Sequence, residues 1–264
     1  MLKAVAFDMD GTLLHINLNA FIGVLVKDES ELLASVGRVD RARTCTALGR
    51  GLWEVNYGEG VRTARDLHDP RRTRTLAQIF NEAAETTCGI PLGDPVIADM
   101  LACYEREALP RRNGAMIGAR PAAGAREALD CVRERGLRVA LLTNPSFKEA
   151  AIRCRMGWAG LADEPFELVT YMENSTYCKP TADYYLEALD KLGLAPEEVL
   201  MVGNDPRRDF MDPDLGLQTA YVGRGTPVRA TWCGSMAEFA ASFTEIEENF
   251  RIREELRATD ARAR

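Results

Sequence analysis

Short apolar runs recur along the chain, and longer stretches with a helical spacing of apolar residues lie between them. Five runs are rich in Val, Leu, Ala or aromatic residues and lack strict alternation, as expected of strands covered on both faces. The predicted strands are 3–8, 137–143, 166–170, 198–203 and 218–223. Runs of this kind favour a buried parallel sheet.

One helical segment precedes the second predicted strand, and two more separate the strands that follow it. Residues 122–136 end at a glycine, residues 144–157 begin near Pro145, and residues 181–193 begin with Thr181 as a candidate N-cap. Strand and helix in regular succession predict right-handed crossovers. The fold class expected is therefore α/β, with a doubly wound, mostly parallel sheet of five or more strands.

Residues 16–114 interrupt this succession directly after the first strand. The stretch is far longer than a crossover needs and contains no convincing strand. Its helical periodicity is clearest in residues 19–39, 73–88 and 95–109. We expect a helical cap domain beside the C-terminal edge of the sheet, inserted into a core of residues 1–15 and 115–235. Residues 236–264 are expected to form a C-terminal helix and a solvated tail.

Composition and charge narrow the range of partners. The chain has 264 residues, is 46% hydrophobic and carries a net charge of −7, which is ordinary for a globular protein and argues against nucleic-acid binding. No apolar run approaches the roughly 18 residues of a membrane span, and the N-terminus lacks the cationic start of a secretory signal. We expect a cytoplasmic protein without a membrane partner, and no feature selects an oligomeric state.

The cysteines support a reducing compartment. Their number, seven, is odd, and no C-x-x-C pair is present, so cysteine spacing gives no indication of zinc. Each cysteine is expected to be a small buried apolar residue.

Polar side chains gather where the predicted strands end. They are Asp8 and Asp10 after the first strand, Thr143 and Asn144 after the second, Lys179 before a helix, and Asp205 and Asp209 after the fourth strand. Ligands of doubly wound sheets bind at this edge. In an extended segment Asp8 and Asp10 point the same way, so only the backbone of Met9 faces the site.

Four carboxylates at one sheet edge would repel one another strongly. A hard divalent cation relieves this repulsion, and carboxylate, carbonyl and water oxygens suit Mg²⁺. Magnesium in such sites usually also binds phosphate oxygens. The sequence therefore predicts a Mg²⁺ cofactor and a phosphorylated substrate.

The stretches "DMDGTLL", "LLTNP", "CKP" and "GNDPRRD" resemble, in order and spacing, the four motifs of the haloacid-dehalogenase-like phosphohydrolase superfamily. The resemblance covers residues 1–15 and 115–230. Longer phrases such as "NPSFKEAAIRCRMGWAGL" are similar to an uncharacterised bacterial branch of these hydrolases. The resemblance implies a Rossmann-like core, and the long insertion matches the helical cap found after the first strand in this superfamily.

The resemblance also implies catalytic roles. Asp8 would be the nucleophile that forms an aspartyl-phosphate, and Asp10 the general acid and then the base. The backbone carbonyl of Asp10 would be a metal ligand. Thr143 would hydrogen-bond a phosphoryl oxygen, together with backbone N–H groups around Met9 and Asn144.

The remaining charged residues would offset the negative charge of the phosphoryl group, either directly or by binding Mg²⁺. Lys179 would neutralise charge on Asp8 and on the bound phosphate. Asp205 would complete the Mg²⁺ site with Asp8, and Asp209 would be a ligand or an outer acceptor. The motif has Asn204 where many members have Asp, so the amide of Asn204 is an alternative ligand.

The function implied is a Mg²⁺-dependent phosphatase that acts on a small phosphorylated metabolite. A phosphosugar mutase, which shares Asp8 and Asp10, is an alternative. So is a non-catalytic binding or regulatory protein on the same scaffold. A phosphonate hydrolase is disfavoured because the cap has a single lysine, Lys27. A haloacid dehalogenase is disfavoured because it does not need Asp10.

Several further residues have ordinary structural interpretations. Thr12 is expected to close the turn after the first strand. His15 is expected to be a flap or surface residue, and His68 a loop residue. Residues 71–74, "RRTR", form either a solvated loop or an arm that meets an anionic substrate. Residues 49–60, glycine-rich around Trp53 and Tyr57, form either ordinary turns with buried aromatics or a mobile specificity loop.

Overall fold

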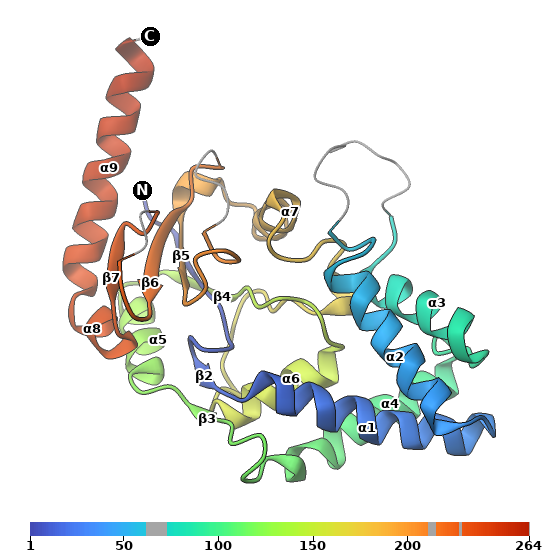
Figure 1. The fold of residues 1–264 in the computed structure, drawn as a ribbon. Helices are drawn as coiled ribbons and strands as arrows, with labels where there is room; N and C mark the ends of the chain where they lie inside the picture. The colour runs from blue at the N-terminus through green and yellow to red at the C-terminus, as the bar shows by residue number, and fades with distance from the viewer. Residues whose placement is uncertain (62–72, 211–214, 227–228, 264) are drawn as a thin grey trace.

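Five parallel strands lie side by side in the central sheet of the computed structural model, which describes residues 1–61, 73–210, 215–226 and 229–263. They are β4 (Arg138–Leu141), β1 (Ala4–Phe7), β5 (Val199–Gly203), β6 (Gln218–Val222) and β7 (Trp232–Gly234), in their spatial order (Figure 1). Every neighbouring pair is parallel. The predicted fold class is confirmed.

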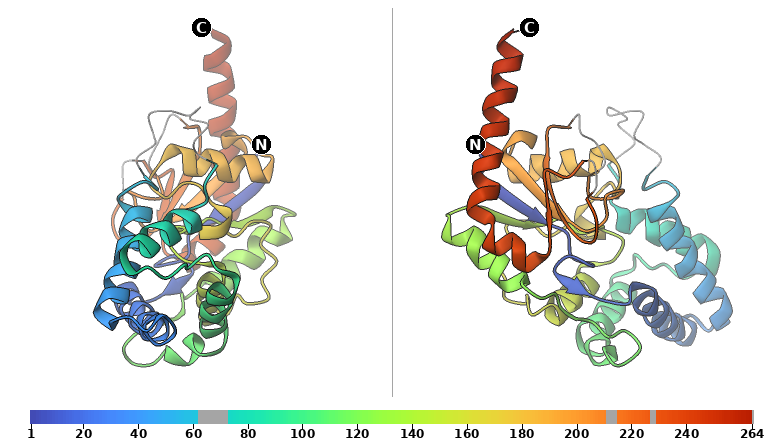
Figure 2. Two further views of the ribbon diagram at one scale, coloured as in Figure 1. Left: turned by 90° about the vertical axis from the view of Figure 1, so that its right-hand side faces the viewer. Right: turned by 60° about the vertical axis from the view of Figure 1, so that its left-hand side comes forward.

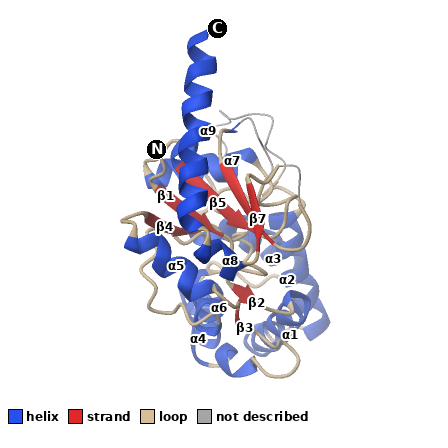
Figure 3. Cartoon of the chain, turned by 90° about the vertical axis from the view of Figure 1, so that its left-hand side faces the viewer, coloured by secondary structure: helices blue, strands red, loops and turns tan. Residues whose placement is uncertain are grey.

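Both faces of the sheet are covered by helices, which explains the absence of polar alternation in β1. Val5 and Phe7 belong to the core cluster beneath α5 (Ala125–Glu134), α8 (Met236–Ala241) and α9 (Phe243–Ala263). Ala4 and Ala6 belong to the cluster beneath α7 (Ala182–Leu192) on the opposite face. Figure 3 shows α5, α8 and α9 together on one face of the sheet.

The helix ends follow the sequence signals. Thr181 accepts a hydrogen bond from the backbone N–H of Tyr184, and Gly193 ends α7 at a φ of 62°. Gly136 follows α5 at a φ of 70°. Glycine adopts these left-handed angles without the steric cost that a Cβ would bring.

Four helices form the inserted region and share a core of their own. They are α1 (Leu18–Gly37), α2 (Arg41–Asn56), α3 (Leu76–Cys88) and α4 (Pro95–Glu107). Buried residues from all four meet in one cluster that includes Leu33, Leu48, Phe80 and Leu101. These helices lie together on one side of the molecule, and α9 projects from the other (Figures 1 and 2).

A two-stranded ribbon joins the inserted helices to the sheet. The chain leaves the core through β2 (Leu14–His15) and returns through β3 (Arg120–Pro121), and the two strands pair antiparallel. His15 is exposed in β2. This ribbon is not predicted from the sequence, because two-residue strands are too short to show a hydrophobic period.

Three predicted elements differ from the structure. The strand predicted at 166–170 forms only one isolated bridge, between Leu141 and Val169, at the edge of the sheet. The helix predicted from 144 is α6 (Glu149–Trp158), because residues 144–147 form a loop whose side chains are hydrogen-bonded elsewhere. Most of segment 49–60 belongs to α2 and is not a loop.

The C-terminal part contains one strand that the sequence did not predict, β7, followed by α8 and α9. Cys88, Cys154 and Cys178 are buried as expected, whereas Cys45 and Cys103 are exposed, and all seven cysteines are free. None of the described helices combines the length and the hydropathy that crossing a membrane requires. His68 and residues 71–72 lie outside the described residues.

Two buried carboxyl groups meet inside the cap region. Glu29 of α1 and Glu105 of α4 are 5% and 1% exposed, and each leaves one oxygen without a partner. Burial raises the pKa of Glu29 against the opposing effect of Lys148. Burial, and next the charge of Glu29, raise the pKa of Glu105 well above its usual value. At neutral pH the pair therefore opposes folding unless one group keeps its proton.

We expect the stability of the protein to fall as pH rises through these raised pKa values. The folded state binds protons at Glu29 and Glu105 more tightly than the unfolded state. The free energy of unfolding that this proton binding contributes is therefore full below the ordinary glutamate pKa and is lost toward neutral pH. Glu105→Gln should raise the melting temperature at pH 8 and flatten its decline between pH 5 and pH 8. Glu107→Gln, an exposed change on the same helix, is the control, and an equal effect of both changes would contradict the assignment.

Candidate active site

A cavity of about 590 Å³ opens at the C-terminal edge of the sheet, beneath the cap helices. Its described lining consists of Asp8, Asp10, Leu18, Asn19, Ile22, Gly49, Leu52, Trp53, Asn56, Tyr57, Thr143, Asn144, Ser146, Phe147, Lys179, Asn204, Asp205, Arg208 and Asp209. The polar residues that the sequence placed at strand ends all line it. Met9 does not, because its side chain is fully buried in the core between the two aspartates.

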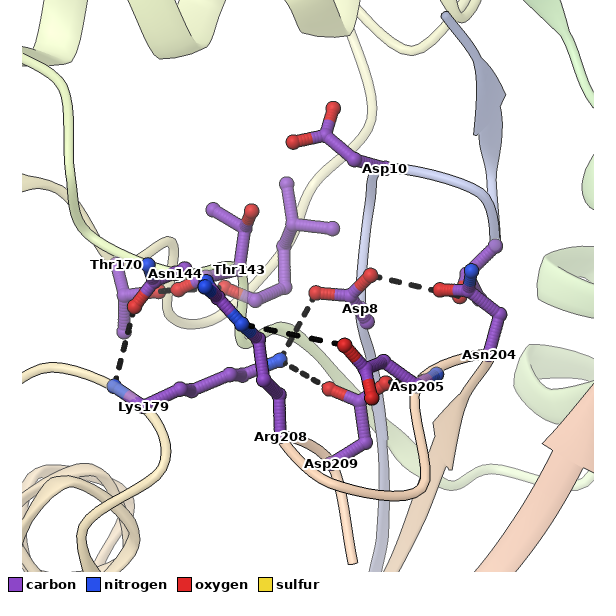
Figure 4. A network of polar contacts seen from close by, with 12 residues as sticks. Asp8, Asp10, Thr143, Asn144, Thr170, Lys179, Asn204, Asp205, Arg208 and Asp209 are labelled. Atoms are coloured by element: carbon purple, nitrogen blue, oxygen red, sulfur yellow. Dashed lines mark hydrogen bonds and ion pairs between the residues drawn. The ribbon is translucent and has the colours of Figure 1, made fainter. Parts of the chain in front are cut away.

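Lys179 lies between two carboxylates at the base of the cavity. Its Nζ atom is 2.8 Å from Asp8 Oδ1 and 2.6 Å from Asp209 Oδ1 (Figure 4). The Lys179 side chain is 1% exposed and that of Asp209 is 2% exposed. One cation therefore faces two anions in a site that water barely reaches, and the cluster keeps an excess negative charge.

Burial and charge act in opposite directions on this cluster. Burial raises the pKa of Asp8, and Lys179 partly opposes the rise. Burial likewise raises the pKa of Asp209 to about 6, against the lowering effect of Lys179. Burial lowers the pKa of Lys179, but Asp209 and Asp8 outweigh it and raise this pKa well above the usual value. Lys179 therefore remains protonated and is the fixed cation of the site.

Asp10 is held by an arginine that the sequence analysis did not single out. Arg155 of α6 is fully buried, and its Nη1 donates a hydrogen bond to Asp10 Oδ2. Its guanidinium carbon lies 4.7 Å from the ring centre of Phe147 and 5.2 Å from that of Phe21. The Asp10 carboxylate is 20% exposed and reaches the cavity.

The loop after β4 is fixed by its own side chains. Asn144 Oδ1 accepts a hydrogen bond from the backbone N–H of Lys179, and Nδ2 donates to Ser146 and to Asn56 Oδ1. Ser146 also donates to Asn56, which belongs to the cap helix α2. The amide of Asn144 is thus fully engaged, so a bound anion would meet the backbone N–H groups of this loop. Thr143 lines the cavity beside it.

The turn after β1 packs against the loop after β5. Gly11 has a φ of 83°, and a Cβ there would lie 2.3 Å from the Asn204 side chain. Glycine at position 11 thus allows Thr12 to donate to Asn204 Oδ1 at 3.2 Å, with Asp8 Oδ2 at 3.5 Å. A Cβ at Gly203 would lie 2.3 Å from Asp209 Oδ2, so this glycine makes room for the carboxylate that pairs with Lys179.

Asp205 and Asp209 have different surroundings. Both oxygens of Asp209 are engaged, one by Lys179 and the other by the backbone N–H of Asp205. The Asp205 side chain is 45% exposed, with Arg208 3.9 Å away. Asp205 Oδ1 accepts a hydrogen bond from the backbone N–H of Arg207 at 2.9 Å, so Oδ2 of Asp205 is the oxygen that keeps free acceptor capacity.

The acceptor groups at the base of the cavity suit a hard cation. The carboxylates of Asp8 and Asp205 and the amide of Asn204 offer oxygen atoms, and no His or Cys is among the described lining residues. Oxygen donors in a site with excess negative charge favour Mg²⁺. The described residues contain no group of three His, Cys, Asp or Glu side chains placed to hold a metal ion, so a bound ion would also need carbonyl, water or substrate oxygens.

Sequence reasoning missed the residues that act from outside the motifs. Arg155 pairs with a residue 145 positions away, and Asn56 bonds to one 88 positions away. Neither contact can be read from the sequence around its residues, because the partners are so far apart along the chain. The two aromatics of segment 49–60, Trp53 and Tyr57, are 42% and 64% exposed and line the cavity, so the expectation of turns with buried aromatics is wrong.

We expect Asp10→Ala to destabilise the protein, because it leaves the guanidinium of Arg155 buried without its anion. Breaking a buried ion pair on one side costs about 3–5 kcal/mol of the free energy of unfolding. The double variant Asp10→Ala, Arg155→Met should recover much of this loss, since it removes the orphaned charge. Urea unfolding of the three proteins measures both effects. A double variant no more stable than Asp10→Ala alone would contradict the role given to Arg155.

Two characterised phosphatases have related sequences. Phosphoserine phosphatase of Thermus thermophilus is 38% identical over 96 residues, a match that spans 35% of this chain and only 36% of that protein. N-acetylmuramic acid 6-phosphate phosphatase of Pseudomonas aeruginosa is 27% identical over 225 residues, which cover 85% of this chain and 83% of that protein. The second match thus extends over most of both proteins.

Solved structures of other proteins share the fold of this chain. A HAD phosphatase from Thermococcus onnurineus superposes with a TM-score of 0.51 at 19% identity, covering 93% of this chain and 97% of that one. The family model of haloacid dehalogenase-like hydrolases matches residues 2–210, which include all the residues gathered around Lys179. The chain therefore belongs to the haloacid dehalogenase-like hydrolase family.

Proposed function

We propose that this protein is a Mg²⁺-dependent phosphatase that hydrolyses a small phosphorylated metabolite through an aspartyl-phosphate on Asp8. The contact between Asp8 and Lys179 supports the proposal, because a carboxylate that can act as a nucleophile and a fixed cation lie together at the base of the cavity. The phosphatase names of two related proteins support it. The seven free cysteines support a reducing compartment, and we propose the cytoplasm.

In the first half-reaction the chain supplies the nucleophile and the acid. An Asp8 oxygen forms a bond to phosphorus, and the bond from phosphorus to the alcohol oxygen of the substrate breaks. Asp10, at the edge of the same cavity, enters this step in its protonated form and gives that proton to the departing oxygen. Lys179 and backbone N–H groups after Thr143 stabilise the charge on the phosphoryl oxygens.

In the second half-reaction water replaces the alcohol. Asp10, now a carboxylate, takes a proton from a water molecule, whose oxygen attacks phosphorus. The bond between phosphorus and Asp8 breaks, and inorganic phosphate leaves. Dividing the hydrolysis into two displacements lets one carboxyl group act as acid and then as base.

The residues proposed to hold Mg²⁺ are the carboxylates of Asp8 and Asp205 and the backbone carbonyl of Asp10. When bound, the ion supplies positive charge that offsets the carboxylates and the phosphate. We propose that Asp209 acts differently and holds Lys179 in place, because both of its oxygens are already engaged. Asn204 remains an outer partner of Thr12.

We expect the purified protein with Mg²⁺ to release phosphate from p-nitrophenyl phosphate, and Asp8→Asn to lower kcat by at least about a thousandfold. The amide is a far weaker nucleophile than the carboxylate, while its size is nearly the same. Asp163→Asn, at an exposed position, is the control for the same chemical change. Retained turnover by a folded Asp8→Asn protein would overturn the assignment of the nucleophile.

Removal of divalent cations should abolish phosphate release, and added Mg²⁺ should restore it. Because Asp205 has free acceptor capacity, Asp205→Asn should raise the Mg²⁺ concentration needed for half-maximal rate by about tenfold, equivalent to about 1.4 kcal/mol of binding. The rise in melting temperature with Mg²⁺ gives a second readout that does not depend on turnover. Full activity in the presence of a chelator would contradict the metal proposal.

A further inference from the structure

The cap side of the cavity is built from one face of each of two helices. Helix α2 contributes Gly49, Leu52, Trp53 and Asn56, followed by its C-cap residue Tyr57, and helix α1 contributes Leu18, Asn19 and Ile22. The spacing in α2 is that of a single helical face. Every one of these residues is uncharged, whereas the described cations and anions of the lining come from the core.

Three of these cap residues offer neutral hydrogen-bonding groups. The side-chain amide of Asn19, the indole of Trp53 and the hydroxyl of Tyr57 make no hydrogen bond in the described part of the chain, and all three residues are exposed and line the cavity. Asn56 is different, because both ends of its amide are already bonded within the protein. Leu18, Ile22 and Leu52 supply apolar surface between the polar groups.

Among the residues that the structure describes, two cations lie close to this wall or its cavity, and each has a carboxylate beside it. Arg50 lies over the ring of Trp53, with its guanidinium carbon 4.7 Å from the ring centre, and is paired with Glu54. Arg208 lines the cavity but lies beside Asp205, at the end where the phosphoryl group is proposed to bind (Figure 4). Neither places an unpaired charge on the cap wall.

We infer that the cap wall is a binding site for an uncharged ring-bearing alcohol, such as the hydroxylated ring of a hexose phosphate. A sugar ring has apolar C–H faces that lie against aromatic and aliphatic side chains, and a rim of hydroxyl groups that bond to neutral donors and acceptors. A serine-like alcohol brings an ammonium and a carboxylate that this wall leaves unpaired, at a cost in binding. A cavity of about 590 Å³ holds more than a bare phosphate.

Gly49 gives a direct way to test the wall. A Cβ at this position would meet no atom within 4 Å, so a larger side chain can enter the cavity without disturbing α2. Gly23 of α1 has equally open space, is exposed and is not among the lining residues. Gly49→Phe and Gly23→Phe are therefore matched changes, one inside the cavity and one outside.

The first experiment compares kcat/KM of the Mg²⁺-loaded wild type for glucose 6-phosphate, phosphoserine and acetyl phosphate. We expect glucose 6-phosphate to exceed phosphoserine by at least about tenfold. Gly49→Phe should lower the ratio of glucose 6-phosphate to acetyl phosphate turnover by at least about tenfold, and Gly23→Phe should leave that ratio unchanged. Trp53→Ala, which removes the indole from the wall, should raise KM for glucose 6-phosphate more than it alters kcat. Equal or better turnover of phosphoserine would overturn the inference.

The inference rests on the proposed function, so binding is measured separately from turnover. Titration calorimetry of Asp8→Asn with Mg²⁺ should show glucose 6-phosphate binding at least about tenfold more tightly than phosphoserine. Preferential hexose phosphate binding without turnover of any ester, p-nitrophenyl phosphate included, would uphold the cap site and overturn the phosphatase. Hydrolysis of p-nitrophenyl phosphate without a preference for glucose 6-phosphate would uphold the phosphatase and overturn the cap site.

Discussion

The burial of Lys179 between Asp8 and Asp209 is the constraint on which the rest of the site depends. Transferring three charged groups from water costs several kcal/mol for each ion, and only close, well-directed contacts offset that cost. Asp8 follows β1, Asp209 belongs to the loop after β5, and Lys179 precedes α7. The three elements must therefore hold their relative positions for the cluster to be stable at all.

The central place of β1 in the sheet meets this demand. It pairs with β4 on one side and with β5 on the other, so the loops that carry Asp8, Thr143 and Asp205 leave three adjacent strands at the same edge. Small residues complete the fit, since Gly11 and Gly203 allow side chains of the neighbouring loop to approach the backbone. The chemistry at this edge thus follows from strand order as much as from the residues themselves.

The sheet and the motif residues could be predicted from the sequence because each leaves a local trace. Unbroken apolar runs indicate strands covered on both faces, and acids directly after such runs indicate a polar sheet edge. The contacts of Arg155 and Asn56 could not be predicted, because each joins segments that only the folded chain brings together. A buried arginine within an ordinary helical segment has the same local pattern as an exposed one.

The segments that were predicted wrongly have a common cause. Residues 144–147 were assigned to a helix because Pro145 is a good first helical residue, yet Asn144 and Ser146 bond to Asn56 and Lys179 instead. Tertiary hydrogen bonds there outweigh local propensity. In segment 49–60 the glycines suggested turns, but residues 49–56 belong to α2, which packs against α3, so tertiary packing outweighs local propensity there.

The ribbon of β2 and β3 has a consequence for how the chain folds. Pairing β1 with β4 brings together residues that are 134 positions apart, from Ala4 to Arg138. Closing so long a loop is slow, because entropy is lost before the contacts form. The inserted helices contact one another mainly as sequence neighbours, such as α2 with α3, and can form early. Once they have formed, Leu14 and Pro121 lie side by side, and the effective loop is short. The insertion that interrupts the core in sequence thus shortens the path by which the core assembles.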